Sequence, residues 1–191
     1  MGHKEDLLAG AKAALIERGY ANTTARDIVA ASHTNLASIG YHYGSLDALL
    51  TQAMIDMMGE WGSKFAEASA EQKAKSTEAK FRAVWGALLK LFETDRALAI
   101  ASFEIGVQAV RSPELRAIFA EVYEGVRRDL PEDFLDPEKL DTKTRRAVGS
   151  LLLAIISGVT VQVLLDPEGA PTADELTLAM KTIAKAFMAK G

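Results

Sequence analysis

The sequence contains no cysteine, and this absence removes several kinds of chemistry at once. Disulfide frameworks, thiol nucleophiles, zinc fingers and iron–sulfur clusters all need cysteine and are excluded. Histidine is scarce as well, because His3, His33 and His42 are the three in the chain, and none stands at a metal-ligand spacing from an acidic cluster. We therefore expect neither a metal nor another cofactor.

The sequence also lacks a group of residues spaced as in a catalytic site. His42 has no carboxylate or nucleophile at a spacing that would make it a general base, and the acidic residues of the loops are expected to be solvated. There is no glycine-rich phosphate loop. The sequence thus favours a binding protein over an enzyme, and an all-helical enzyme would have to be reconsidered only if a bound cofactor were found.

Long apolar runs are few. The N-terminus has none, so we expect no signal peptide. Ala147–Leu165 is long enough to span a membrane, but small and polar residues interrupt it at helical spacing, and a helix buried on most of its faces explains it better. We expect a cytoplasmic protein with no membrane partner. The net charge of −4 argues mildly against bulk affinity for nucleic acid.

Strand-like alternation is nearly absent, and apolar residues recur at the spacing of helices throughout the chain. We predict an all-α protein. Residues 64–77 are polar and alanine-rich, with the junction expected at "SAEQKAKST", residues 69–77, and residues 131–140 are expected to form a loop. The expected helices cover residues 4–18, 25–32, 36–43, 45–63, 77–93, 95–110, 113–130, 141–165 and 172–190.

Residues 24–43 have the pattern of a helix-turn-helix, although such patterns also arise by chance in alanine-rich helical proteins. Ile28, Val29 and Ile39 are apolar where the two helices must pack. Ala31 and Ala37 are small enough to let the two backbones approach closely. The opposite face of the second helix is small, polar and uncharged, which suits entry into the major groove of DNA. That face comprises Thr34, Asn35, Ala37, Ser38, Tyr41 and His42.

The run "TTARDIVAASHTNLASIGYHYGSLDALL" resembles the N-terminal DNA-binding domain of the TetR family of bacterial repressors. The shared features are an aliphatic residue, a Tyr-His-aromatic segment, Gly-Ser, and an acidic residue before a Leu-Leu pair. The resemblance is specific over roughly the first 55 residues, and the remainder agrees in length and helical layout. It implies a helix-turn-helix domain over residues 1–48 and a larger helical ligand-binding and dimerisation domain over residues 49–191.

The resemblance also implies partners and residue roles. The partner would be double-stranded operator DNA with a roughly palindromic sequence, because two recognition helices of a dimer would read successive major grooves. Thr24 would donate to a phosphate, Asn35 and Ser38 would face bases, and Tyr41 and His42 would reach the backbone. The protein would be a repressor that releases its operator when a small molecule binds the C-terminal domain.

Four positions bear on how well the N-terminal region, residues 1–50 and called the head below, would bind DNA. Tyr43 would be the buried aromatic residue that fastens the recognition helix to the first helix. His33 replaces a usual turn glycine, and histidine tolerates positive φ better than most residues. Gly40 lies inside the recognition helix, where glycine costs about 1 kcal/mol of helix stability. Leu46 replaces a lysine that would meet a phosphate in the family.

Charge in the head is nearly balanced. Phosphate neutralisation normally dominates DNA affinity, so we expect modest affinity and a shallow dependence on salt. A helical ligand- or protein-binding module with weakened DNA affinity is the alternative, and DNA binding at physiological salt distinguishes the two. Residues 1–50 hold four cations against five carboxylates, a net charge of −1, from Lys4, Lys12, Arg18 and Arg26 against Glu5, Asp6, Glu17, Asp27 and Asp47.

Aromatic side chains in the later helices predict a ligand pocket, although ordinary core packing is the alternative for each of them. Glu104 and Gln108 share a helix with Phe103, and a mostly apolar cavity with a few polar groups is typical of a small-molecule site. The resemblance implies a small, partly hydrophobic effector. The residues expected to line its pocket are Trp61, Phe65, Trp85, Phe103, Glu104, Gln108, Phe119 and Tyr123.

The last two expected helices, residues 141–165 and 172–190, are candidates for a four-helix interface in a homodimer. Small residues in the first of them favour close helix packing, either within one chain or between two. The family resemblance favours dimerisation. These small residues are Gly149, Ser150, Ser157 and Gly158.

Overall fold

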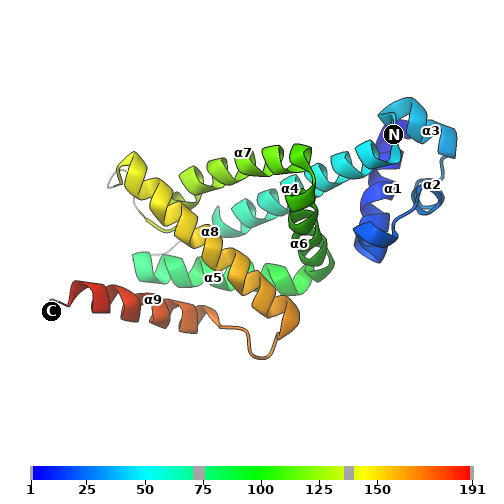
Figure 1. The fold of residues 1–191 in the computed structure, drawn as a ribbon. Helices are drawn as coiled ribbons and strands as arrows, with labels where there is room; N and C mark the ends of the chain where they lie inside the picture. The colour runs from blue at the N-terminus through cyan, green and yellow to red at the C-terminus, as the bar shows by residue number, and fades with distance from the viewer. Residues whose placement is uncertain (1, 71–75, 136–139, 190–191) are drawn as a thin grey trace. The chain divides into compact units, whose positions relative to one another are not determined.

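The computed structural model describes residues 2–70, 76–135 and 140–189, and every regular element in those ranges is helical (Figure 1), which confirms the all-α prediction. Short 3₁₀ turns, η1 and η2, accompany the α-helices. The elements are α1 (His3–Arg18), η1 (Tyr20–Asn22), α2 (Ala25–Ser32), α3 (Leu36–Tyr43), α4 (Leu46–Ala70), α5 (Thr77–Thr94), α6 (Arg96–Arg111), α7 (Pro113–Asp129), η2 (Leu130–Asp133), α8 (Thr142–Leu165) and α9 (Ala173–Met188).

Most helices begin where a short polar side chain can satisfy their first free N–H groups. The side-chain oxygens of Thr24, Ser76, Asp141 and Thr172 each accept a hydrogen bond from the backbone three residues on. These caps fix the starting residues of α2, α5, α8 and α9.

Two predicted connections can be compared with the structure. Helix α4 continues to Ala70 through residues that are good helix formers, and so it includes the first two residues of the expected junction, 69–77. Ser69 is buried there, and its hydroxyl donates to the carbonyl oxygen of Phe65 at 2.9 Å. The predicted loop at residues 131–140 begins with the helical turn η2. Residues 71–75 and 136–139 lie outside the described residues.

The chain divides into two compact units. Unit 1 contains Met1–Ser63 and Ala97–Phe119, and unit 2 contains Lys64–Arg96 and Ala120–Gly191. Helices α4, α6 and α7 therefore contribute residues to both units. The functional division expected at residue 48 lies within α4 and stays a prediction.

The core of unit 1 joins α1 to α2 very closely. A Cβ atom on Gly10 would lie 2.8 Å from the carbonyl oxygen of Ile28 and 2.7 Å from Cβ of Ser32, so α1 needs glycine there. Ile28 is fully buried at this contact. The prediction that Ala31 and Ala37 permit close packing is wrong, because both are exposed and the close approach is between α1 and α2.

The core of unit 2 is built on α5, against which α8, α9 and η2 pack. Trp85 and Phe92 of α5 are completely buried, and the ring of Phe134 lies 5.3 Å from that of Phe81. Arg96 donates to the carbonyl oxygen of Leu164 at 2.7 Å and so satisfies the C-terminal end of α8.

Helix α8 is less buried than the sequence suggested. It is long and apolar enough to cross a membrane by length and composition, with a mean hydropathy of 2.2, yet only 22% of that stretch is buried in the single chain. The expectation of a helix buried on most faces is therefore wrong for the single chain. A core helix would have neighbours on several sides, whereas α8 has a buried stripe that includes Gly149, Leu152, Val159 and Val163.

Two glycines of α8 provide a matched test of its packing. A Cβ on Gly149 would lie 2.0 Å from the carbonyl oxygen of Arg127, whereas a Cβ on Gly158 would meet nothing within 4 Å. We expect Gly149→Ala to lower the free energy of unfolding by about 1–3 kcal/mol or more through overpacking. Gly158→Ala should raise it by up to about 1 kcal/mol through helix propensity. Urea unfolding monitored by circular dichroism measures both, and similar values for the two variants would contradict the packing at Gly149.

Candidate functional site

The turn between α2 and α3 depends on one residue with left-handed backbone. His33 has φ 53° and ψ 33° and is the one non-glycine residue with positive φ among those described, as the sequence analysis anticipated. Its N–H donates to the carbonyl oxygen of Val29, which ends α2. Asn35 then caps α3, because its Oδ1 accepts from the N–H of Ser38 at 3.1 Å. The helix-turn-helix predicted for residues 24–43 is therefore present.

The Tyr41-His42-Tyr43 cluster is divided between the surface and the body of the head. Tyr41 is 86% exposed, and its ring meets that of His42 edge-on at 4.8 Å. Tyr43 turns the other way, and its hydroxyl donates to the carbonyl oxygen of Lys4 in α1 at 2.8 Å. Tyr43 is half-buried rather than buried, but it fastens α3 to α1 as expected.

Local hydrogen bonds already engage three of the side chains predicted to meet DNA. The hydroxyl of Thr24 accepts from the N–H of Asp27 and donates to its carboxylate at 2.6 Å. The hydroxyls of Thr34 and Ser32 lie 2.7 Å apart, and Thr34 is half-buried. Asn35 uses its oxygen as a cap, so its side-chain NH₂ is the part left to donate.

The other predicted side chains lie at or near the surface of α3. Ala37 and Tyr41 are exposed, and Ser38 and His42 are half-buried. Ile39 is buried beneath them and holds this face outward. The structure therefore brings these four residues together along one short helix, and it leaves Thr24, Thr34 and Asn35 as supporting groups around it.

Ion pairs within unit 1 neutralise two of the four cations of the head. Lys12 bonds to Asp56 at 2.6 Å and to Glu60. Burial alone would lower the pKa of Lys12, but these carboxylates raise it above its ordinary value. Arg18 pairs with Asp27 at 3.2 Å. These two charges are engaged inside the protein.

Two exposed residues, Arg26 and Leu36, were not among the candidate DNA contacts that the sequence predicted. Arg26 lies in the first turn of α2, where the helix dipole disfavours a cation, and it makes no ion pair with any described residue. A cation in this unfavourable position could have indicated, from the sequence, a residue kept for binding an anion. Leu36, the first residue of α3, is 53% exposed, and nothing in the sequence separated it from core leucines.

The structure does not gather the predicted ligand-binding residues into one site. Trp85 is completely buried, and its indole Nε1 has no hydrogen-bond partner in the part of the chain described. Trp61, Phe65 and Phe119 are half-buried, and Tyr123 is exposed. Phe65, Trp85 and Tyr123 belong to unit 2, whereas the remaining predicted residues belong to unit 1.

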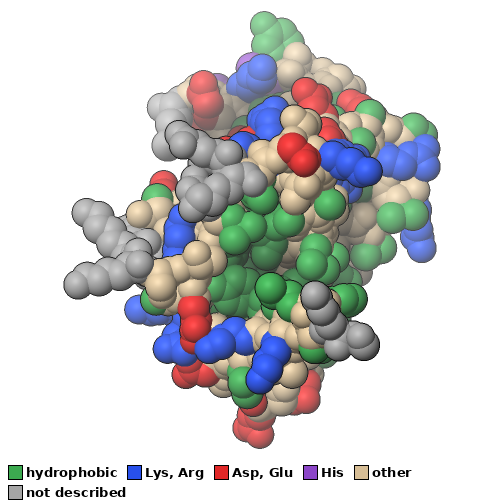
Figure 2. All heavy atoms as spheres, turned by 90° about the vertical axis from the view of Figure 1, so that its left-hand side faces the viewer, with side chains coloured by type: hydrophobic (Ala, Val, Ile, Leu, Met, Phe, Trp, Pro, Cys, Tyr) green, Lys and Arg blue, Asp and Glu red, His purple; other side chains and the backbone are tan. Residues whose placement is uncertain are grey.

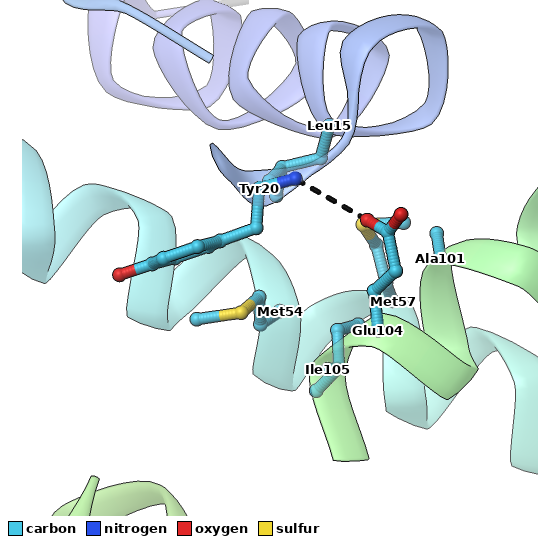
Figure 3. Close-up of a pocket in the computed structure, with 7 residues that line it drawn as sticks. All are labelled: Leu15, Tyr20, Met54, Met57, Ala101, Glu104 and Ile105. Carbon is cyan, nitrogen blue, oxygen red and sulfur yellow. Dashed lines mark hydrogen bonds between the residues drawn. The ribbon is translucent and has the colours of Figure 1, made fainter. Parts of the chain in front are cut away.

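Three predicted residues do share a cleft. Phe103, Glu104 and Gln108 of α6, with Val107, face residues 18–22 across a cavity of about 230 Å³ in unit 1. Glu104 reaches from α6 toward the backbone of Tyr20, whose N–H donates to Oε2 at 3.3 Å (Figure 3).

A second, internal cavity adjoins this link. Its volume is only about 10 Å³, and its walls come from α1, η1, α4 and α6 (Figure 3). That is room for about one water molecule. The residues around it are Leu15, Tyr20, Met54, Met57, Ala101, Glu104 and Ile105.

Comparison with known proteins agrees with this geometry at both ends of the chain. A family model described as "Bacterial regulatory proteins, tetR family" matches residues 7–53. A second, described as "BetI-type transcriptional repressor, C-terminal", matches residues 77–188. A search of curated proteins finds no match.

Solved structures share the whole fold. A proposed transcriptional regulator from Streptomyces coelicolor A3(2) is 24% identical, with a TM-score of 0.73 and 96% of each chain covered. A multidrug binding protein, EbrR, complexed with imidazole is 25% identical, with a TM-score of 0.69 over 94% of this chain and 88% of that one. EbrR complexed with ethidium is 22% identical, with a TM-score of 0.70 over 95% and 98%.

Two glycines at α3 test whether its backbone is as described. A Cβ on either Gly40 or Gly44 would meet nothing within 4 Å, but Gly44 has φ +79° and Gly40 is helical. Gly40→Ala should raise the free energy of unfolding by about 1 kcal/mol, because alanine is the better helix former. Gly44→Ala should lower it by about 1–2 kcal/mol, because of its left-handed backbone. Urea unfolding of both variants measures the difference, and a stabilising Gly44→Ala would contradict the turn.

Proposed function

Because the chain belongs to the TetR family of bacterial transcriptional regulators, we propose that it is a homodimeric repressor that binds a palindromic operator and releases it when a small molecule binds. Its family members are DNA-binding transcription factors rather than enzymes, and the C-terminal domain of the family binds ligands. We place the protein in the cytoplasm, where its operator would lie.

The observation that carries the DNA-binding proposal is the outward face of α3. An eight-residue helix with Ile39 buried and Tyr41 86% exposed has the form of a recognition helix. In the major groove, Leu36 and Ala37 would contact thymine methyl groups, and Ser38 would reach base edges. Tyr41 and His42 would donate to phosphates and so fix the register.

Helix α2 would supply the remaining contacts. Arg26 is exposed at its first turn and offers a charge for a phosphate. Thr24 would contribute its position at the N-terminus of α2, where free N–H groups attract an anion, more than its engaged hydroxyl. Thr34 and Asn35 would hold the turn that presents α3. Few cations are available in all, which favours modest affinity and also supports the alternative of a module with weakened DNA affinity.

The dimer would form through α8 and α9. Figure 2 shows hydrophobic side chains gathered on the side where the C-terminal end of α9 lies. Large exposed apolar residues on both helices would gain about 1.5–3 kcal/mol each on full burial. A partner helix pair accounts for this surface, and for the apolar α8, without a membrane. These residues are Leu151, Leu165, Leu178, Ile183, Phe187 and Met188.

The effector would be small and partly hydrophobic. EbrR, which is named a multidrug binding protein and was solved with imidazole, is 25% identical to this chain. In unit 2, the buried Nε1 of Trp85 is a donor that a ligand could satisfy, since buried donors are nearly always hydrogen-bonded. We propose Phe65, Trp85 and Tyr123, which all belong to unit 2, as residues that line the effector pocket.

Release would be a population shift between two arrangements of the dimer. Helix α4 supplies Leu49 and Leu50 to the core of unit 1 and continues to Ala70 in unit 2. A ligand that favours another position of α4 would change the spacing of the two recognition helices. Two α3 helices at the wrong spacing cannot occupy successive major grooves together.

The DNA-binding proposal is tested by fluorescence anisotropy with DNA from upstream of the gene. Tyr41→Ala and His42→Ala should each weaken binding by about 3- to 10-fold, as expected for the loss of one hydrogen bond of about 0.5–1.5 kcal/mol. Val110→Ala, which truncates a 74% exposed side chain on α6, is the control and should bind normally. Absence of saturable binding at low salt, across a pool of genomic fragments, would instead favour the ligand-binding module.

Salt dependence tests the role of Arg26. Each phosphate-neutralising cation contributes about −0.9 to the slope of log K against log salt, so Arg26→Ala should make the slope of the dimer shallower by about 2. Arg111→Ala removes an exposed cation from the end of α6 and should leave the slope unchanged. An unchanged slope in Arg26→Ala would remove this arginine from the interface.

The dimer is tested by placing a charge on α9. Leu178 is 65% exposed in the single chain, so Leu178→Asp should be tolerated by the protomer and should weaken the dimer, because the carboxylate would be desolvated in an apolar interface. Sedimentation velocity over a range of concentrations measures the dissociation. Val110→Asp is the matched control on an exposed apolar site of α6. A dimer that persists unchanged in Leu178→Asp would place the interface elsewhere.

A further inference from the structure

The cleft on unit 1 has features that neither DNA binding nor the proposed effector pocket uses. It lies between residues 18–22 and one face of α6, all within unit 1. We propose that it binds a small organic cation with an aromatic or aliphatic body. The cationic group would pair with Glu104, and the body would lie on Phe103 and Val107.

The charge of the cleft favours a cation. Glu104 accepts a long hydrogen bond of 3.3 Å from Tyr20 and forms no ion pair with the residues that the structure describes. Arg18 also borders the cleft, but Asp27 pairs with it at 3.2 Å and offsets its charge. Together these three groups carry two negative charges and one positive charge. A bound ammonium group would restore the balance.

Gly19 keeps the approach to Glu104 open. Its φ is +72°, and a Cβ atom there would lie 2.9 Å from Oε2 of Glu104. A side chain at this position would cover the carboxylate. The glycine thus leaves acceptor capacity on Glu104 beyond the one bond from Tyr20, since a carboxylate has about four lone-pair sites.

The walls and volume limit the rest of the ligand. Phe103 is 49% exposed and Val107 is 45% exposed, so an apolar body would cover surface that now faces water. The volume of about 230 Å³ is below the range of about 300–1,000 Å³ usual for drug-sized ligands. The internal cavity beneath Glu104 holds no more than about one water, which confines the ligand to the cleft itself. An amine with a single ring has suitable dimensions.

Occupation of the cleft would act on the DNA-binding helices. A ligand cation would share the carboxylate of Glu104 with the N–H of Tyr20, and Tyr20 begins the turn that follows α1. Helix α1 in turn packs on α2 and α3. An effect of the cation on operator affinity is therefore expected. That effect rests on the proposed function, whereas binding of the cation does not.

Isothermal titration calorimetry of the full chain without DNA tests the site directly. The probes are benzylamine, the neutral benzyl alcohol and the anionic benzoate. Benzylamine should bind with a Kd on the order of 1 mM, as expected for a ligand of this size. Benzyl alcohol should bind at least about tenfold more weakly, because hydrogen bonds between two charged groups are worth more than those of a neutral hydroxyl. Benzoate should bind at least as weakly as the alcohol, because Glu104 repels its carboxylate.

Glu104→Gln isolates the charge. Glutamine keeps a carbonyl oxygen that can accept from Tyr20, so the fold should persist, and its thermal unfolding checks this. Benzylamine affinity should fall about tenfold or more in this variant. Glu121→Gln, which neutralises an exposed carboxylate on α7, should bind as the unmodified protein does.

Three results would overturn the proposal: no heat from benzylamine up to about 10 mM, equal binding of the three probes, or unchanged affinity in Glu104→Gln. Operator anisotropy with and without benzylamine then separates the two proposals. A chain that binds benzylamine at Glu104 but no DNA retains the cation site and loses the repressor function. A chain that binds DNA but not benzylamine retains the repressor function alone.

Discussion

The close packing of α1 on α2 is the contact on which the DNA-binding surface depends. Helix α3 has only eight residues, and a helix of two turns is not stable alone in water. Its position comes from Ile39 in the core and from the hydroxyl of Tyr43 on the backbone of α1. Helix α1 can hold that position because Gly10 lets it approach α2. The outward direction of Tyr41 follows from this packing.

The same head uses much of its charge to hold itself together. Lys12 joins α1 to α4 through Asp56 and Glu60, and Arg18 joins α1 to Asp27 of α2. These pairs hold in place the helices that present α3, but they withdraw cations from phosphate neutralisation. Stability of the head and affinity for DNA therefore compete for the same few side chains, and shape and hydrogen bonding must supply more of the recognition.

Two other surfaces of the chain, the exposed apolar side chains of α8 and α9 and the cleft at Glu104, have features that suit a binding partner. Helices α8 and α9 expose several large apolar side chains, among them Leu165, Phe187 and Met188, and an identical helix pair would cover such side chains symmetrically. The cleft at Glu104 lies in unit 1, so a ligand there would act on α1 directly. A signal from the effector pocket proposed for unit 2 would instead travel along α4, which contributes residues to both units.

The sequence by itself determined the helices and the helix-turn-helix, because apolar spacing, caps such as Thr24 and the turn at His33 are local properties. It also predicted that Tyr41 and Tyr43 have different roles. Only the tertiary structure decided which polar groups are engaged, since the partners of Lys12, Tyr20 and Tyr43 lie far away in the sequence. For the same reason, the sequence could not separate the cleft at Glu104 from the buried Trp85: both lie on amphipathic helices, and neighbours across space decide which side chain faces a cavity.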